Sequence, residues 1–271
     1  MRTVILVIGV LCFASYSSAQ KAVSEQEWKL FWSDEFNYKG LPDSTRWAYE
    51  VGGHGWGNNE KQYYREKSLE NSFVSDGKLH IVALKKDFEN LGYTSARLTT
   101  YKKCSIQYGK VEVMAKLPEG KGTWPAIWMF PESARNNKEK WPLCGEIDIM
   151  EHVGRDPNVL HTSLHSQLYN HVKGTQVTHF EKLPDVFNTF HKYGIEWTKD
   201  YIKFYIDDKL FFGTNKGENG RVSTNEGWPF DKPYFLILNL AIGGNWGGEI
   251  DDTIFPTEMQ IDYVRVYQKN K

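Results

Sequence analysis

Three carboxylates fall within six residues in the segment 145–152, which reads GEIDIMEH. On a regular β-strand alternate side chains point to opposite faces, so Glu146 and Asp148 share one face while the isoleucines between them face a core. Glu151 would then lie on the wrong face. A one-residue β-bulge at or near Met150 would return it to the face of the other two acids. The spacing therefore predicts a bulged strand that carries three converging acids.

Such a trio suits the hydrolysis of a glycosidic bond. Carboxylates that crowd one face repel each other, so at least one keeps its proton to a higher pH than usual. Glycosidases use this difference, because one carboxylate attacks the anomeric carbon while a neutral carboxylic acid protonates the leaving oxygen. The alternatives are a solvated acidic strand and a cation site. Acids between isoleucine and methionine are unusual on a solvated strand, and cation sites more often draw oxygen ligands from loops.

Composition excludes several other classes of protein. The 271 residues carry 33 basic and 34 acidic side chains, without a basic block. There is thus no electrostatic reason to expect a nucleic-acid or membrane partner. Aromatic residues make up 15% of the chain, too many for a disordered protein. We expect a compact, monomeric protein.

The first 19 residues are typical of a signal peptide. Arg2 precedes an apolar stretch at 4–14, and small residues at 17–19 suit cleavage after Ala19. The apolar stretch is shorter than the roughly 20 residues that span a membrane. The sequence therefore predicts a secreted protein, periplasmic or extracellular, with one domain at 20–271.

The remaining chain has the period-two alternation of β-strands at 78–84, 110–117, 201–206 and 260–267. Turn residues bound these segments, which favours antiparallel hairpins. Residues 183–190 are the only weak helix candidate. About a dozen strands without βαβ alternation predict an all-β fold, a β-sandwich or jelly roll, in which one curved sheet forms a concave cleft. Cys104 and Cys144 are too few for a disulfide framework, and we expect two buried thiols.

Segments along the whole chain resemble glycoside hydrolase family 16, and its laminarinase group in particular. The acidic segment GEIDIME resembles the signature of the branch with a bulged strand. Further similar segments follow in family order: SDEF at 33–36, WGNNE at 56–60, YY at 63–64, TSAR at 94–97, YGKVE at 108–112, GTWPAIW at 122–128 and NLAIGGNW at 239–246.

The resemblance implies a concanavalin A-like jelly roll with the substrate cleft across its concave sheet. It implies that Glu146 is the nucleophile and Glu151 the general acid and then base, with Asp148 setting the charge of the nucleophile. No cofactor is implied for catalysis. The residues alone indicate the same three acids but leave the roles of the two glutamates open.

Aromatic and polar side chains around the motif are candidates for sugar binding. Trp124 and Trp128 share a strand face because they are four residues apart, and with Trp246 they can stack on pyranose rings. The alternative for each is a place in the core. Weaker loop candidates are Trp56, Trp141 and Trp228. Asn58 and Arg97 resemble family positions that hydrogen-bond sugar hydroxyls near the cleavage point, and His165 resembles a family histidine near the carboxylates. A structural ion pair is the alternative for Arg97, for which the resemblance favours binding, and a structural role is the alternative for His165. His152 should point away from the cleft, and His161 lacks a third metal ligand at suitable spacing.

The resemblance and the charge together favour a neutral β-1,3-glucan as the substrate, and mixed-linkage β-1,3-1,4-glucan stays open. A sulfated polymer would favour an excess of basic residues, which the chain lacks. A non-catalytic glucan-binding module on the same scaffold is the alternative function, since a fold does not dictate chemistry. Transglycosylation, in which a sugar hydroxyl replaces water, is also open.

A structural Ca²⁺ is implied by analogy with the family. The matching positions are Glu35, the carbonyl of Gly77, and Asp262. Carboxylate and backbone oxygens suit this cation. A purely structural Asp262, paired with Arg265 or with backbone amides, is the alternative.

Overall fold

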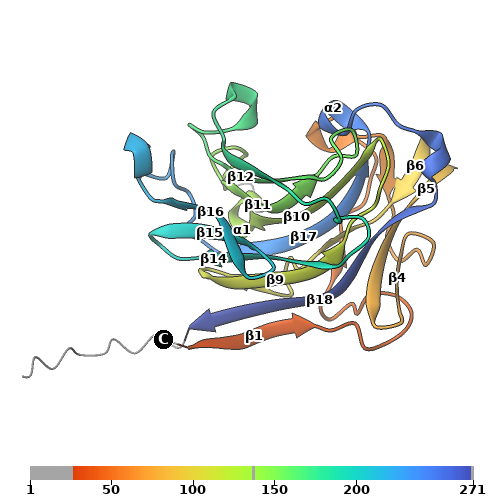
Figure 1. Cartoon of the computed structure of the whole chain (residues 1–271), viewed down its shortest axis with the longest axis horizontal. Coiled ribbons are helices and arrows are strands. Elements are labelled where there is room, and N and C mark those ends of the chain that lie inside the picture. Colours follow the sequence, from red (N-terminus) through yellow and green to blue (C-terminus); the bar gives the residue numbers. More distant parts are fainter. Residues whose placement is uncertain (1–26, 136–137, 270–271) are drawn as a thin grey trace, which may run out of the picture.

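The computed structural model describes residues 27–135 and 138–269, so the predicted signal peptide lies outside the described residues. These residues form two stacked β-sheets (Figure 1). The ten-stranded sheet contains β1 (Trp28–Asp34), β3 (Gln62–Tyr64), β4 (Ser72–Ser75), β5 (Lys78–Phe88), β6 (Leu91–Ser95), β9 (Gly109–Lys116), β14 (His191–Trp197), β15 (Tyr201–Ile206), β16 (Lys209–Asn215) and β18 (Thr257–Lys269). The eight-stranded sheet contains β2 (Ala48–Tyr49), β7 (Arg97–Thr99), β8 (Ser105–Ile106), β10 (Thr123–Pro131), β11 (Glu146–His152), β12 (Val159–His165), β13 (Val177–Lys182) and β17 (Tyr234–Ile242).

The main path of the eight-stranded sheet runs β13-β12-β11-β10-β17-β7-β2, which places the acidic strand β11 between β10 and β12. The other sheet runs β16-β15-β14-β9-β18-β5-β6-β3. Pairing is antiparallel throughout the described residues except between β3 and β6. This confirms the predicted sandwich of antiparallel strands.

Helices are short in the described part of the chain: α1 (Glu132–Arg135), α2 (Gly244–Gly247), and the 3-10 turns η1 (Gly55–Gly57), η2 (His171–Lys173), η3 (Glu218–Gly220) and η4 (Asp252–Ile254). None of them has the length and apolar character needed to cross a membrane. The weak helix expected at 183–190 is wrong, because this segment forms only turns. The amide of Val186 donates to the carbonyl of Leu183, and the amides of Asn188 and Thr189 both donate to that of Asp185, so the hydrogen bonds close short consecutive turns.

The main core lies between the two sheets and follows the alternation seen in the sequence. In β15, for example, Ile202, Phe204 and Ile206 are buried while the intervening residues are partly exposed. Cys104 and Cys144 are free thiols in or near this core. Burial raises their pKa values to about 11 and about 12. The expectation of two buried thiols is therefore confirmed.

A second apolar cluster lies on the outer face of the eight-stranded sheet. Its buried members are Tyr64, Trp124, Val153 and Ala241, and Trp56 and Trp246 pack against it. As a result β17 is buried on both faces, and none of its nine residues is exposed. The outer face of this sheet therefore carries packed aromatic side chains of its own.

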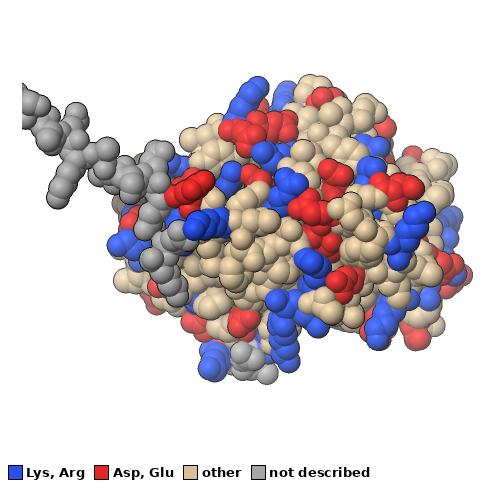
Figure 2. Space-filling model, turned by 90° about the horizontal axis from the view of Figure 1, so that it is seen from below, with Lys and Arg blue, Asp and Glu red and all other residues tan. Residues whose placement is uncertain are grey.

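Charged side chains of both signs are interspersed on the face of the molecule seen from below (Figure 2).

Candidate active site

A β-bulge interrupts β11 at the position that the acidic motif requires. The consecutive residues Ile127 and Trp128 of β10 pair with Met150 and Asp148, which are two apart, so β11 contains one extra residue. The pairing of β11 with β12 shifts at the same place. Because the bulge absorbs one residue, Glu151 returns to the face of the other two acids. The predicted bulge is confirmed.

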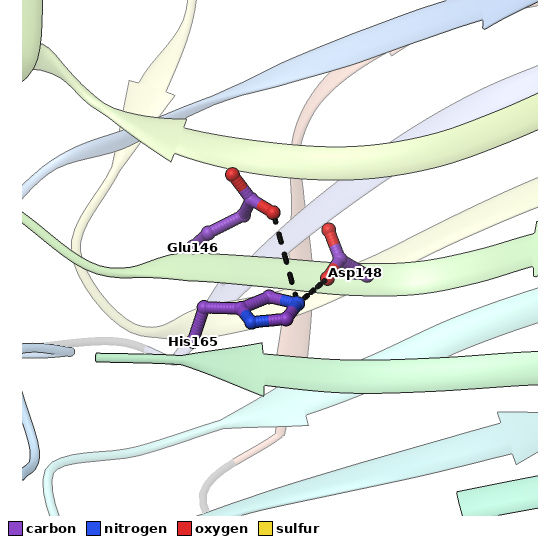
Figure 3. Close-up of side chains that lie close together, drawn as sticks. All are labelled: Glu146, Asp148 and His165. Carbon is purple, nitrogen blue, oxygen red and sulfur yellow. Dashed lines mark ion pairs between the residues drawn. The ribbon is translucent and has the colours of Figure 1, made fainter. Parts of the chain in front are cut away.

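Glu146 and Asp148 lie close together beside His165, which reaches them from the neighbouring strand β12 (Figure 3). The Nε2 atom of His165 is 3.2 Å from Oδ2 of Asp148 and 3.9 Å from Oε1 of Glu146. Asp148 is almost completely buried, whereas the side chain of Glu146 is 19% exposed. The structure thus places His165 beside the carboxylates, and Glu146 is the acid of this pair that a ligand can reach.

Glu151 is fixed by an aromatic side chain of β10. The indole Nε1 of Trp124 donates a hydrogen bond of 3.0 Å to Oε1 of Glu151. Trp246 packs edge-on against Trp124, with the ring centroids 5.5 Å apart. Of the three tryptophans expected to bind sugar, Trp124 therefore lies directly beside one of the acids, and Trp246 packs against Trp124.

Burial and mutual repulsion oppose the ionisation of all three acids at once. Burial, and after it the charge of Asp148, raises the pKa values of Glu146 and Glu151 to about 8. Burial also raises the pKa of Asp148 well above its usual range. The charges of His165 and Arg97 act in the opposite direction on the pKa of Glu146. This is the proton distribution that the spacing of the acids predicts.

Arg97 lies between two aromatic rings of the site. Its guanidinium carbon is 4.5 Å from the ring centroid of Trp56 and 4.7 Å from that of Trp128. Its Nε is 2.6 Å from a carboxylate oxygen of Glu50, which also pairs with Arg135. Arg97 is therefore an ion-pair partner, which is the structural alternative given for it from the sequence. It also supports the ring of Trp128 through a cation–π contact.

A buried hydrogen-bond network under Trp128 was missed by the sequence analysis. The indole Nε1 of Trp128 donates to Oδ1 of Asn239 at 2.8 Å, and Asn239 donates to the hydroxyl of Tyr64 at 3.1 Å. Tyr64 and Gln62 in turn donate to Oε2 of Glu60. Glu60, Tyr64, Trp128 and Asn239 all lie in segments that resemble the family. That resemblance does not reveal which of them are hydrogen-bonded to one another.

Two loops that carry predicted binding residues meet at one end of the site. The amide of Asn245 donates to the carbonyl of Asn58 at 2.7 Å, and the Asn58 side chain lies 3.5 Å from Glu60. Gly244 has a φ of +80°, and a Cβ there would lie 2.8 Å from the Asn58 carbonyl oxygen. Glycine at this position thus permits the close approach that sets Trp246 beside the site.

Three further candidates from the sequence lie in different places. His152 is buried against Phe187, on the side away from the acids as expected, and Trp228 packs on Phe230. By contrast, Trp141 lies beside His165, with ring centroids 6.1 Å apart, so Trp141 belongs to the surroundings of the acids.

Glu146, Asp148 and His165 also lie close enough together to hold a cation, with their ligand atoms within 4.8 Å of one another. The predicted calcium positions lie elsewhere. Glu35 follows β1, and Gly77 lies in the turn between β4 and β5. The strands β1 and β5 both pair with β18, which carries Asp262.

The carboxylate of Glu35 does not fit a calcium ligand as it is placed. Nε and Nη2 of Arg265 donate to its two oxygens at 2.9 and 2.8 Å. A cation would have to displace this bidentate ion pair, which suits a carboxylate well. The calcium site stays a prediction, and no step of the chemistry depends on it.

We expect EDTA to leave the melting temperature unchanged, because Arg265 already neutralises Glu35. Thermal unfolding with and without EDTA measures this. A lower melting temperature that added Ca²⁺ restores would instead support the calcium site.

The fold and the converging acids define the class of this protein, a glycoside hydrolase. The chain belongs to glycosyl hydrolases family 16, whose family model matches residues 59–265. A beta-glucanase of Rhodothermus marinus is 45% identical over 274 residues, which cover 99% of this chain and 95% of that protein.

Solved structures agree with this assignment. The laminarinase from Rhodothermus marinus superposes with a TM-score of 0.87 at 46% identity, covering 90% of this chain and 99% of that one.

A more distant relative is similar in sequence. An endo-1,3-1,4-beta-glycanase of Rhizobium meliloti is 33% identical over 87% of this chain, which corresponds to half of that protein.

Proposed function

We propose that this enzyme is a secreted endo-hydrolase of β-1,3-glucan that retains the configuration at the cleaved bond. The observation that supports this proposal most directly is the bulge in β11. It brings Glu146, Asp148 and Glu151 to one face beside the aromatic cluster. In a double displacement, one carboxylate attacks the anomeric carbon and a second acid protonates the leaving oxygen, then activates water.

The surroundings of the two glutamates support distinct roles. Asp148 is the most deeply buried of the acids, and burial raises its pKa well above the usual range. The charges of His165 and Arg97 lower the pKa of Glu146 and so favour its ionised form. We assign it as the nucleophile.

Glu151 differs from Glu146 in its neighbours. Burial, and after it the charge of Asp148, raises its pKa to about 8, and a raised pKa favours the protonated form that a general acid must supply. The pKa of Glu146 is raised to a similar value, so the two roles are assigned from the neighbours of each group and from the family resemblance. The hydrogen bond from Trp124 fixes the position of this carboxyl group.

The aromatic surroundings favour a neutral sugar polymer as the substrate. Trp124, Trp128 and Trp246 offer ring surfaces beside the acids, and such surfaces suit the apolar faces of pyranose rings. The names of the relatives, laminarinase and endo-1,3-1,4-beta-glycanase, favour β-1,3-glucan and leave mixed-linkage glucan as a second substrate. Asn58 is expected to bind sugar hydroxyls at the rim.

Digestion of laminarin, lichenan, agarose and carrageenan tests this substrate class. We expect reducing ends to appear from laminarin, with weaker release from lichenan and none from the two galactans. Linkage analysis of the products identifies the bond that is cut. Cleavage of a galactan without cleavage of laminarin would contradict the proposal.

A further inference from the structure

Phe180 is an exposed aromatic side chain on β13, the edge strand of the eight-stranded sheet, and 61% of it is accessible to solvent. We propose that Phe180, together with His161, forms a sugar-binding platform that holds the glucan beyond the ring under attack. This inference rests on the proposed function, because it extends the same site. It predicts that the enzyme distinguishes long from short chains.

The strand register places Phe180 on the face of the catalytic acids. His161 of β12 pairs with Glu151 on one side and with Phe180 on the other. Residues directly opposite each other in neighbouring strands point to the same face of a sheet. All three side chains therefore belong to one row across the sheet.

A hydrogen bond one step along the same strands confirms the orientation. Thr178, two residues before Phe180, has its hydroxyl 3.0 Å from the hydroxyl of Ser163. Ser163 pairs with Asp148. Because residues two apart on a strand share a face, Phe180 points to the same side as Thr178 and the acids.

Aromatic rings connect Phe180 to the acids. His161 lies edge-on to Trp246, with centroids 4.9 Å apart, and 6.3 Å from the ring of Phe180. Trp246 in turn packs on Trp124, which binds Glu151. Rings therefore run from the proposed general acid to the sheet edge, and they offer apolar surface along the path that a glucan chain would follow.

The core does not need Phe180. The next residue towards the N-terminus, His179, stacks on Phe212 of β16, with centroids 5.2 Å apart, and its ring lies 6.1 Å from that of Phe180. The aromatic neighbours of Phe180 are thus the two histidines His161 and His179, and most of its own ring is exposed. Phe180 can therefore bind a ligand, and its removal should leave the fold intact.

The position also defines which substrates reach the platform. Two strand spacings separate β13 from β11, so Phe180 lies about 10 Å from Glu151 across the sheet. This distance exceeds one sugar ring. Only a chain that extends past the ring under attack can contact Phe180.

Phe180→Ala tests the proposal on a series of β-1,3-gluco-oligosaccharides of increasing length. We expect kcat/KM on long chains and laminarin to fall about tenfold, the loss of one stacking contact of roughly 1.4 kcal/mol. On the shortest cleaved oligosaccharides kcat/KM should not change. Phe180→Trp should restore the preference for long chains. Phe31→Ala is the matched control, because Phe31 is 56% exposed on β1 of the other sheet.

The outcomes separate this proposal from the proposed function. Equal kcat/KM for Phe180→Ala and the unmutated enzyme at every chain length would overturn the platform, and so would an equal loss at every length. Neither result would contradict the proposed hydrolysis of β-1,3-glucan. That proposal fails only if the unmutated enzyme releases no reducing ends from laminarin.

Discussion

Glu146→Gln should lose at least about four orders of magnitude in kcat on laminarin, because the amide cannot attack the anomeric carbon. The change keeps the size of the side chain, and the residues that hold the site, such as Trp124 and His165, are untouched. Glu89→Gln in an exposed turn is the matched control for the loss of one charge, and it should leave activity unchanged. Reducing-end release by the purified variants measures both.

The same substitution should raise the melting temperature. Burial lifts the pKa of Glu146 in the folded protein to about 8 from an ordinary value of 4.5. Below about pH 4.5 the group is protonated in both states and has no effect. As the pH rises from about 4.5 towards 8, the unfolded chain releases this proton more readily than the folded state, so the folded state loses stability relative to it.

Glutamine removes this loss, so the gain in melting temperature should be near zero at pH 4 and grow up to pH 8. A gain of about 2–4 °C is expected for each kcal/mol at this chain length. Substantial residual hydrolysis would refute the nucleophile assignment. A melting temperature that fell at pH 8 would show that the carboxylate stabilises the fold instead.

Strands with one buried face were predictable because burial imposes a period of two. The alternation at 201–206 matches β15 residue for residue, and that at 110–117 differs from β9 by one residue at each end. The strand β17 gave no such signal, since both of its faces are covered and its sequence YFLILNLAI is apolar except for Asn239. Periodicity likewise misled at 183–190, where the chain makes short consecutive turns and buries Val186.

The acids of the site were predictable because they are close in sequence, and their chemistry itself required the bulge. The support under Trp128 was not. Asn239 and Tyr64 are 175 residues apart in the chain, and no spacing rule connects them. Arg97 shows the same limit, since its partner Glu50 comes from a separate segment. The sequence suggested the groups that react, whereas the groups that position them are set by the tertiary fold.

Glu151→Ala should lower kcat on laminarin by about 10²–10⁴, the usual contribution of a general acid. The loss should be much smaller for the first step on an aryl glycoside with a good leaving group, since such a group departs without protonation. The covalent intermediate should then accumulate, because no base activates water. Azide attacks without a base, so it should restore turnover and give a glycosyl azide of retained configuration.

The pH profile gives an independent check of this role. Burial and the charge of Asp148 raise the pKa of Glu151 to about 8, so the acid keeps its proton below that pH and loses it above. The kcat/KM of the unmutated enzyme should therefore fall as the pH rises through about 8. In Glu151→Ala with the activated substrate this basic limb should disappear.

Trp124→Phe should change the pKa of Glu151 without removing the acid. The indole hydrogen bond lowers the pKa of Glu151, because it stabilises the carboxylate. Phenylalanine keeps an aromatic ring but cannot donate, so the basic limb should move to higher pH. A basic limb that stayed in place in Glu151→Ala would assign it to another group, and the acid would have to be sought elsewhere on the strand.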